Sequence, residues 1–330
     1  MAQSCLWIDW DRHLRTHSLC ERLQIELLEV CIPGSRVLRY LRSSWRTLGR
    51  IRAARPGVVI ATNPSLVLGL LLLLVRRWYG FALVADAHYA GVRALSGSSL
   101  LQRLLDFYNA RAALVIVTNE PHALYLRARG CPAFVCPDPL PRLPPPSALV
   151  VPPRSVFLVC SFDPDEPYAA VFAAFGQLAR QGDYTLIVSG NYAKAGVDPH
   201  GFPGVRLLGY VPEGEYYAYL QACALVMDLT VLEDCLVCGA YEALAAGKPL
   251  ITSASAALRG YFADAALYSA HEPEAIAACV EAAFAEREAL TRRVSSWRVR
   301  NEQLLAERLG ALQGALQGLA AQGLAVKDAS

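Results

Sequence analysis

Short runs of apolar residues recur along the chain, separated by longer stretches in which apolar residues follow a helical period. Such runs favour buried strands and the stretches between them favour helices. One set of runs precedes a proline-rich segment: residues 5–10, 27–32, 58–62, 82–85, 114–118 and 133–136. A second set follows it: residues 156–161, 185–189, 205–207, 224–229, 249–252 and 266–268. This alternation, with nearly continuous apolar strands, predicts an α/β fold whose parallel sheets are covered on both faces.

The proline-rich segment divides the chain. Residues 137–153 contain eight prolines in seventeen positions, which prevents helix and favours an extended, stiff connector. We therefore expect two Rossmann-like domains, over residues 1–140 and 155–330, joined by a linker at residues 141–154. Because ligands of open parallel sheets bind beyond the carboxyl ends of the strands, we expect a cleft between the domains. A helical pattern over residues 290–316 is long enough to return to the first domain.

The composition indicates a folded protein with unevenly divided charge. Apolar residues make up 54% of the chain and charged residues 18%, which excludes global disorder. Residues 1–150 carry 18 basic residues, all arginine, and 9 acidic ones, whereas residues 151–330 carry 13 basic and 20 acidic residues. This asymmetry indicates that the first half meets an anionic surface or ligand.

The cysteine pattern indicates the compartment. Ten cysteines without the spacing of a disulfide scaffold or a zinc site indicate reduced thiols in a cytoplasmic protein.

The longest apolar run, residues 66–75, is about half the length that spans a bilayer, so we expect no membrane crossing. Peripheral attachment to the inner face of a cell membrane remains open.

Two carboxylates, Asp234 and Glu242, are the strongest chemical signal. They lie on either side of a junction at which a loop enters a helix, and a strand at residues 249–252 follows. A ribose offers a vicinal diol to one carboxylate, and a sugar offers hydroxyls to the other, through charge-assisted hydrogen bonds. Backbone N–H groups of the first helical turn, near Cys235 and Leu236, form an anion site suited to a diphosphate. The alternative is an ordinary acid beside an ordinary helix, because short motifs also match by chance.

With Glu242 followed by Ala-Leu-Ala-Ala-Gly-Lys-Pro, this segment resembles the acid-x7-acid motif of retaining nucleotide-sugar glycosyltransferases of the GT-B fold, family 4. Asp234 stands where that family usually has Glu. The resemblance covers the second half of the chain well and the first half weakly. It implies two Rossmann-like domains facing across a cleft, a UDP- or GDP-sugar donor, no cofactor, and retention of the anomeric configuration. In this scheme Glu242 holds the ribose and Asp234 holds donor-sugar hydroxyls.

The resemblance also indicates further donor-binding positions. Gly190 would let the backbone approach the nucleotide, and Val211 leads the loop that often meets the base. Backbone N–H groups near Ala257 and Leu258 would form an anion nest for the leaving diphosphate.

The expected phosphate clamp departs from the family. Residues 161–167 contain three acids and no base, where relatives usually carry an Arg and a Lys. Lys194, Lys248 and Arg259 are the candidate substitutes, and the departure puts catalytic competence in question. The Asp-x-Asp pattern occurs at residues 9–11 and 163–165. Glycosyltransferases of a different fold use this pattern to bind manganese. Because two Rossmann-like halves argue against that fold, we expect no metal site here.

His88 is the catalytic candidate in the first half. It follows an apolar strand that contains Asp86, and polar groups at the carboxyl edge of a sheet usually face ligand. Family members commonly place a His there, near the donor sugar and phosphate. A purely structural histidine is the alternative.

A stripe of arginines marks the predicted helix after the second strand. Arg39, Arg42 and Arg46 belong to a series from Arg36 to Arg50 at steps of three and four, which places them on one side of a helix beside apolar residues and Trp45. A membrane-surface helix has this pattern, and so does the solvated face of an ordinary helix.

We therefore predict a glycosyltransferase that moves a sugar from a nucleoside diphosphate to a lipid-linked or glycan acceptor in bacterial-type surface polysaccharide or glycoconjugate synthesis. Arg12, His13, Arg15 and His17, in the loop after the first strand, would contact the diphosphate of the acceptor. The alternatives are a non-catalytic GT-B-like subunit that binds membrane or acceptor, and a sugar-nucleotide epimerase on the same fold. We expect no nucleic-acid partner, because the arginine stripe lacks interleaved base-stacking aromatics.

Overall fold

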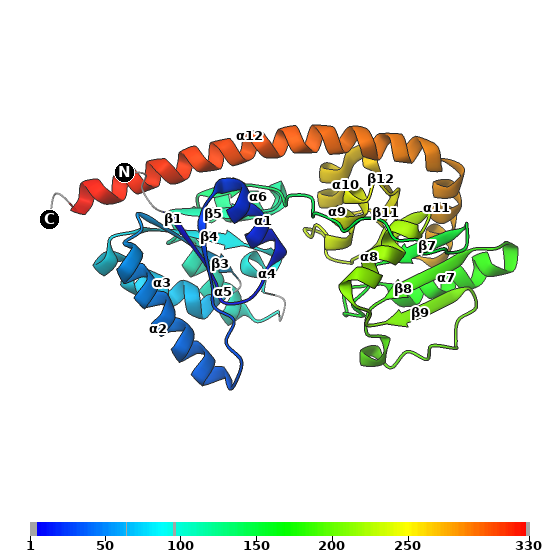
Figure 1. The fold of residues 1–330 in the computed structure, drawn as a ribbon, viewed down its shortest axis with the longest axis horizontal. Coiled ribbons are helices and arrows are strands. Elements are labelled where there is room, and N and C mark those ends of the chain that lie inside the picture. The colour runs from blue at the N-terminus through cyan, green and yellow to red at the C-terminus, as the bar shows by residue number, and fades with distance from the viewer. Residues whose placement is uncertain (1–4, 64, 95–96, 328–330) are drawn as a thin grey trace. The chain divides into compact units, whose positions relative to one another are not determined.

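The computed structural model describes residues 5–63, 65–94 and 97–327, and the chain divides into two compact units. The first unit comprises Met1–Pro139 together with Gln303–Ser330, and the second comprises Leu140–Glu302. The prolines after residue 139 therefore belong to the second unit, and the end of the chain belongs to the first. Figure 1 shows a sheet with flanking helices in each unit.

The first unit is built on six parallel strands in the order β2-β1-β3-β4-β5-β6. The strands are β1 (Cys5–Asp9), β2 (Glu26–Glu29), β3 (Val58–Asn63), β4 (Ala82–Ala87), β5 (Leu114–Val117) and β6 (Ala133–Val135). The helices between them are α1 (Leu14–Leu23), α2 (Arg36–Ala54), α3 (Leu66–Tyr79), α4 (Tyr89–Val92), α5 (Ser99–Asn109) and α6 (Glu120–Arg127).

The second unit has six parallel strands in the order β12-β11-β10-β7-β8-β9. Its strands are β7 (Ser155–Leu158), β8 (Thr185–Ser189), β9 (Val205–Gly209), β10 (Leu225–Asp228), β11 (Leu250–Ser253) and β12 (Ala266–Ser269). Its helical elements are α7 (Tyr168–Gln181), η1 (Tyr192–Ala195), α8 (Glu213–Ala222), α9 (Cys238–Ala245), α10 (Ala256–Phe262), η2 (Ala263–Ala265), α11 (Pro273–Ala285) and the beginning of α12 (Arg287–Lys327). The predicted α/β fold with two parallel sheets is confirmed.

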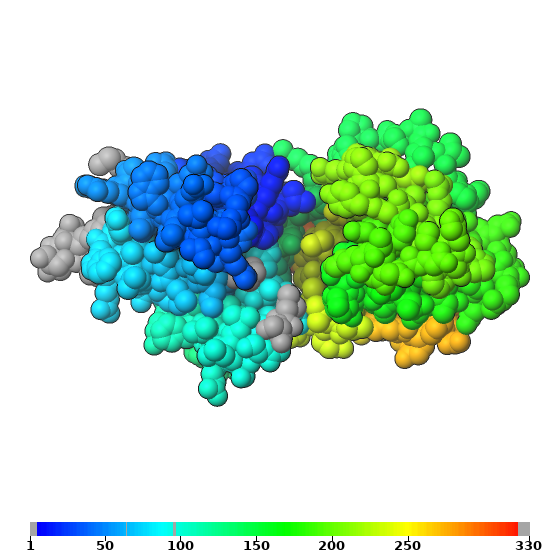
Figure 2. Space-filling model, turned by 90° about the horizontal axis from the view of Figure 1, so that it is seen from below, coloured from blue at the N-terminus to red at the C-terminus, as the bar shows by residue number. Residues whose placement is uncertain are grey.

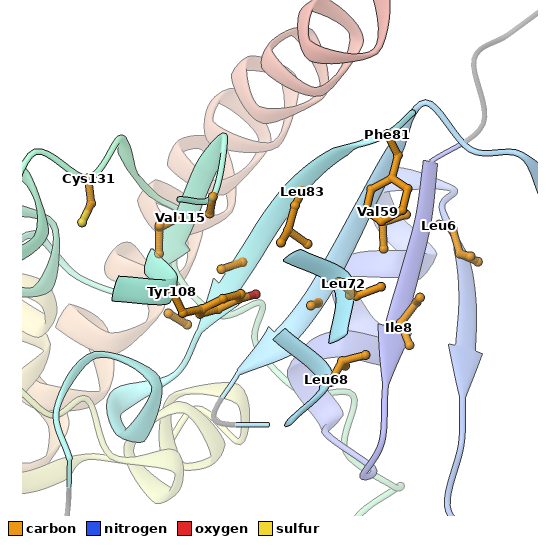
Figure 3. Close-up of a cluster of buried hydrophobic side chains, with 14 of the residues drawn as sticks. Leu6, Ile8, Val59, Leu68, Leu72, Phe81, Leu83, Tyr108, Val115 and Cys131 are labelled. Atoms are coloured by element: carbon orange, nitrogen blue, oxygen red, sulfur yellow. The ribbon is translucent and has the colours of Figure 1, made fainter. Parts of the chain in front are cut away.

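Alternate side chains of each strand enter different cores, as the period of two requires. Leu6 and Ile8 of β1 pack in one cluster with Leu68 and Leu72 of α3 (Figure 3), whereas Trp7 packs in the cluster on the other face. Both faces of the sheet are therefore covered, and this accounts for the nearly continuous apolar strands. None of the helices in the described ranges combines the length and the hydropathy that a bilayer crossing requires.

The last helix supplies side chains to both units. Leu290, Val294 and Trp297 pack in the cores of the second unit, whereas residues further along α12 pack with Trp7 of the first: Leu305, Leu309, Leu312, Leu316 and Ala320. The helix begins and ends outside the predicted range of 290–316, and it continues to Lys327.

A buried ion pair joins α1 to the carboxyl edge of the first sheet. Arg15 was predicted to lie in a loop and contact the acceptor, but it belongs to α1 and its three guanidinium nitrogens are engaged within the unit. The guanidinium donates to Asp86 at 3.1 Å, to the Cys136 carbonyl at 3.0 Å and to Asp138. Burial alone would raise the pKa of Asp86, but Arg15 and, to a smaller degree, His88 more than offset it and lower that pKa to about 2.

Replacing Arg15 tests this structural role. Arg15→Met leaves the Asp86 carboxylate buried without its partner, a change that typically destabilises a protein by about 3 to 5 kcal/mol. Urea unfolding followed by far-UV circular dichroism measures the loss. The exposed Arg12→Met is the control, expected to stay within about 0.5 kcal/mol of the wild type. Equal unfolding midpoints for the two variants would contradict the assignment.

Candidate functional site

The second unit contains a cavity of about 740 Å³ at the carboxyl ends of its central strands. Segments that follow β7, β8, β9 and β10 form its wall together with the first turns of α8 and α9, the position at which parallel sheets bind ligands. Residues important below are among those that line it: Ser161, Glu166, Gly190, Lys194, Val211, Tyr216, Tyr217, Asp228, Cys235, Leu236, Gly239 and Glu242.

Glu242 is held in this cavity by two tyrosines. Tyr216 donates its hydroxyl to one carboxylate oxygen, and Tyr217 donates to the other at 3.4 Å. Burial raises the pKa of Glu242, and the two tyrosine hydrogen bonds oppose that rise. The pKa values of both tyrosines are raised by burial and by the neighbouring carboxylate, so they remain hydroxyl donors at neutral pH. The carboxylate is thus oriented to accept from two hydroxyl groups at once, as it would from a vicinal diol.

Asp228 is a second buried carboxylate in the cavity wall, and the sequence reasoning missed it. It ends β10, and its carboxylate accepts hydrogen bonds from the backbone N–H groups of Gly239 and Ala240. Burial and the charges of Glu166 and Glu242 raise its pKa well above the usual value. The expected anion site in this helical turn is therefore occupied in part by the chain's own carboxylate, which uses two of the N–H groups that a diphosphate would need.

Gly239 makes this close contact possible. A Cβ at this position would lie 2.6 Å from Asp228 Oδ2 and 2.7 Å from Val159 Cβ. The absence of a side chain therefore lets the start of α9 approach β10 closely enough to reach the carboxylate.

Gly190 is required by the chain's own packing. Its φ is +109°, and a Cβ there would lie 1.9 Å from the Cys160 carbonyl oxygen. The resemblance predicts that the missing side chain of Gly190 lets the backbone approach the nucleotide. In the structure it lets the loop after β7 pack against Gly190.

The acidic segment after β7 folds around Glu166. The Glu166 carboxylate accepts the backbone N–H groups of Ser161 at 3.0 Å and Asp163 at 2.9 Å. Lys194 forms an ion pair with Asp163, and the hydrogen bond from Lys194 lowers the pKa of Asp163. Lys194 is the one cation among the residues that line the cavity, all of which lie in the described ranges. The diphosphate clamp expected from relatives has no other basic residue in this wall.

The structure places the remaining donor-binding candidates in two groups. Val211, Cys235 and Leu236 line the cavity with Glu242, whereas Asp234 is half-buried outside the lining. The start of α10 is separate from the lining residues of this cavity. There, Leu258 donates its N–H to Ser255 Oγ at 3.3 Å and Ala257 is buried.

The basic candidates Arg259 and Lys248 also have local partners. Arg259 stacks on the Tyr268 ring at 4.7 Å and donates to the Ala254 carbonyl. Lys248 donates to the Cys223 carbonyl at 2.9 Å. Neither side chain lines the cavity of Glu242.

In the first unit, His88 lies at the carboxyl end of β4 beside a second histidine. Its Nε2 is 3.6 Å from Asp86 Oδ2, and its ring is 5.1 Å from the ring of His13. His13 pairs with Asp9 at 2.7 Å, and this hydrogen bond raises the pKa of His13. Two imidazoles, each close to a carboxylate, therefore meet at one sheet edge: His88, the catalytic candidate, and His13, one of the predicted acceptor contacts.

His13 and Asp9 also line a small polar cavity of about 160 Å³ in the first unit. Arg39 of α2 reaches this cavity as well. Of the predicted acceptor contacts, Arg12 is exposed just before α1, and His17 in α1 pairs with Glu29 of β2.

Comparison with known proteins gives one family match and several structures of the same fold. Residues 173–314 match a protein family described as glycosyl transferase-like, while no curated protein sequence matches the chain. The structure is similar to HepE of Anabaena, solved in complex with UDP and glucose, at 14% identity over 95% of this chain and 99% of that one, with a TM-score of 0.67. It is also similar to sucrose-phosphate synthase of Thermosynechococcus elongatus, at 16% identity over 99% and 100% of the chains, with a TM-score of 0.68.

This chain has the GT-B fold, as predicted, and residues 173–314 resemble the glycosyl transferase-like family in sequence. A putative UDP-N-acetylglucosamine 2-epimerase of Listeria monocytogenes is similar too, at 13% identity over 89% of this chain and 91% of that one, with a TM-score of 0.58. At these identities the likeness establishes the fold alone, and the family match extends over residues 173–314.

Gly239 provides a direct test of the cavity's architecture. Gly239→Ala places a methyl group against Asp228 and Val159, and overpacking of this kind costs about 1 to 3 kcal/mol. Urea unfolding of the full-length protein measures the resulting loss of stability. The matched control is Gly176→Ala within α7, where a Cβ meets nothing within 4 Å and alanine is favoured by about 0.5 to 1 kcal/mol. If the Gly239→Ala variant were as stable as the wild type, the close packing of α9 against Asp228 and Val159 would not require a glycine.

Proposed function

We propose that the protein is a glycosyltransferase that uses a nucleoside-diphosphate sugar as donor. The observation that carries this proposal is the Glu242 carboxylate, which already accepts from two hydroxyls inside a cavity large enough for a nucleotide. In the proposed complex the ribose diol of a UDP- or GDP-sugar takes over the hydrogen bonds that Tyr216 and Tyr217 now donate. The family match and the UDP complex of the similar HepE protein make UDP the first nucleotide to examine.

The remaining roles follow the resemblance. Asp234 contacts hydroxyls of the donor sugar, and Val211 and the backbone at Gly190 border the nucleotide. His88 acts near the transferring sugar, and the anomeric configuration is retained. Catalysis requires groups that favour the charge developing on the leaving diphosphate more than the ground-state charge. In this chain that task falls to Lys194, once it exchanges Asp163 for phosphate. The resemblance adds N–H groups near Ala257 and Leu258 with Arg259, which lie outside the cavity lining and would have to exchange their present partners for phosphate.

We further propose an acceptor that is lipid-linked or a glycan, in surface polysaccharide or glycoconjugate synthesis. The excess of arginine in the first 150 residues supports an acceptor that carries phosphate. Arg12 and His17 lie at the surface of α1 or just before it, so both remain acceptor-contact candidates, whereas Arg15 is withdrawn into the unit. This assignment implies a cytoplasmic enzyme that works at the inner face of a membrane and needs neither metal nor cofactor.

One observation favours a second candidate, a non-catalytic GT-B-like subunit. The cavity wall holds Glu166, Asp228 and Glu242, and its one lysine is already paired with Asp163. A diphosphate in such surroundings meets more repulsion than attraction unless Lys194 is released. Turnover of a nucleotide sugar distinguishes the two functions, because a subunit that binds acceptor alone releases no UDP. An epimerase would instead change the sugar while it remains attached to UDP.

If Glu242 holds the ribose, removing its charge should weaken the binding of UDP. Glu242→Gln keeps the shape of the side chain and removes its charge, which weakens charge-assisted hydrogen bonds worth about 1.5 to 3 kcal/mol each. We expect the dissociation constant of UDP in calorimetric titration to rise roughly tenfold to a hundredfold. Glu215→Gln, an exposed residue of α8 outside the cavity lining, is the control and should bind as the wild type does. Unchanged affinity in Glu242→Gln removes the ribose assignment.

The role of His88 predicts a loss of rate rather than of stability. If this imidazole acts near the transferring sugar, His88→Ala should slow UDP release from UDP-glucose by roughly 10² to 10⁴, the usual contribution of a positioned proton-transfer group. Its urea midpoint should shift little, since the side chain is a quarter exposed. The exposed His200→Ala serves as control for rate and stability. A large shift in midpoint with unchanged rate would identify a structural histidine.

A further inference from the structure

The outer side of α2 presents apolar side chains to solvent. Val37 is 69% exposed, Leu38 52%, Leu41 62% and Trp45 78%. Leu38, Leu41 and Trp45 follow the three-and-four spacing that places residues on one side of a helix. The buried side of the same helix carries Ser43, Thr47 and Ile51. The usual arrangement, with apolar residues inward and polar ones outward, is thus partly reversed on α2.

The neighbouring helix α3 extends this surface. Leu74 is 66% exposed and Trp78 is 77% exposed, and α2 and α3 contact one another. Arg76 and Arg77 directly precede Trp78. Figure 2 shows α2, in blue, on the face of the first unit that is turned toward the viewer. Exposed apolar residues scattered singly need no explanation, but several large ones on adjacent helices indicate a surface that meets a partner.

The charge of these helices identifies the partner. Neither α2 nor α3 contains an acidic residue, and α2 alone contains six arginines: Arg36, Arg39, Arg42, Arg46, Arg50 and Arg52. Arg50 pairs with Glu26 of β2, whereas Arg42 and Arg46 form no ion pair within the described part of the chain. Exposed tryptophan and leucine side chains require an apolar environment in the partner, and the neighbouring arginines require negative charge at its surface. An anionic lipid leaflet has both properties.

We propose that α2 and α3 form a docking surface for an anionic lipid bilayer. In the docked state Trp45, Trp78 and the exposed leucines enter the boundary between headgroups and acyl chains, where an aromatic ring with one polar atom is favoured. The arginines extend their apolar stems along the same surface and contact lipid phosphates with their guanidinium groups. This inference goes beyond the transfer reaction and does not depend on it.

The distribution of tryptophans gives docking its own spectroscopic signal. Of the five tryptophans, Trp7, Trp10 and Trp297 are at most 6% exposed, so a membrane changes their surroundings little. Trp45 and Trp78 are the exposed ones, and both belong to the proposed surface. A shift of the intrinsic fluorescence to shorter wavelength on addition of vesicles therefore reports on this surface.

The test uses vesicles of phosphatidylcholine alone and of phosphatidylcholine with an equal part of phosphatidylglycerol. The full-length protein should co-sediment with the anionic vesicles at low salt, with a blue shift of its fluorescence, and bind the neutral ones far less. The double variant Arg42→Gln, Arg46→Gln should bind about 25-fold more weakly, because each arginine near an anionic leaflet contributes about fivefold, the equivalent of about 1 kcal/mol. Added salt should weaken the wild type more steeply than this variant.

A second double variant, Trp45→Ser with Trp78→Ser, should lose the blue shift altogether and bind more weakly at every salt concentration. The control is Arg298→Gln with Val299→Ser, an exposed basic and apolar pair on α12 within the second unit, which should bind vesicles like the wild type. Titration of all variants with UDP separates this test from that of the proposed function. A protein that binds vesicles but not UDP would contradict only the proposed function, and one that binds UDP but not vesicles would contradict only the docking surface.

Three results would overturn the inference. One is failure of the wild-type protein to bind anionic vesicles at low salt. Another is binding that is unchanged in both the arginine and the tryptophan variants, which would assign docking to a different surface. The third is self-association of the wild type without vesicles that disappears in the tryptophan variant, since the surface would then be an interface between copies of the chain.

Discussion

Each sheet holds a carboxylate, at or beside the carboxyl end of a central strand, that water scarcely reaches, and the compensation of that charge organises the residues around it. In the first unit an arginine from α1 meets Asp86, so the carboxylate stays ionised and its pKa falls to about 2. In the second unit Asp228 accepts from backbone N–H groups, but burial and the charges of Glu166 and Glu242 raise its pKa. An isolated buried charge is too costly to keep, and in both units a helix, α1 or α9, brings the partner groups to the carboxylate.

The second solution also sets the chemistry of the large cavity. With Glu166, Asp228 and Glu242 close enough to influence one another, this wall favours ligands that bring hydroxyl groups and disfavours bare anions. The tyrosines on Glu242 are consistent with such a preference, because they occupy the carboxylate with hydroxyls. A nucleotide sugar carries both kinds of group, so its hydroxyl end matches this wall better than its diphosphate does. The energetic difficulty of the proposed reaction therefore lies at the diphosphate.

Much of the architecture could be predicted because the strands are short apolar runs with clear ends. Covering helices on both faces make most strand residues apolar, and this pattern is visible without knowledge of contacts. Glu242, Cys235 and Leu236 were found through a motif whose spacing crosses a loop and a helix, and Val211 through the wider family resemblance. The pairing of Asp228 with α9 could not be predicted, because it depends on the close approach that Gly239 permits. A polar residue at the end of the apolar run Leu225–Asp228 was its one visible signal.

Arg15 illustrates the other limit. A basic residue shortly after a strand has the same appearance in the sequence whether it faces a ligand or turns inward to Asp86, which lies 71 positions away. Only the packing of α1 against the strand ends distinguishes the two. The tyrosines on Glu242 are a similar case, because their contact joins α8 to α9 and carries no local pattern.

The division of α12 between the units has a consequence for the order of folding during synthesis. A ribosome that has made residues 140–302 has delivered the whole second unit, whose sheet and covers come from one continuous stretch. The first unit, although its strands emerge earlier, still lacks Leu305, Leu309, Leu312 and Leu316, which cover the face of its sheet that contains Trp7. The half that is translated first is thus completed last, and its apolar sheet face needs protection until the final helix has left the ribosome.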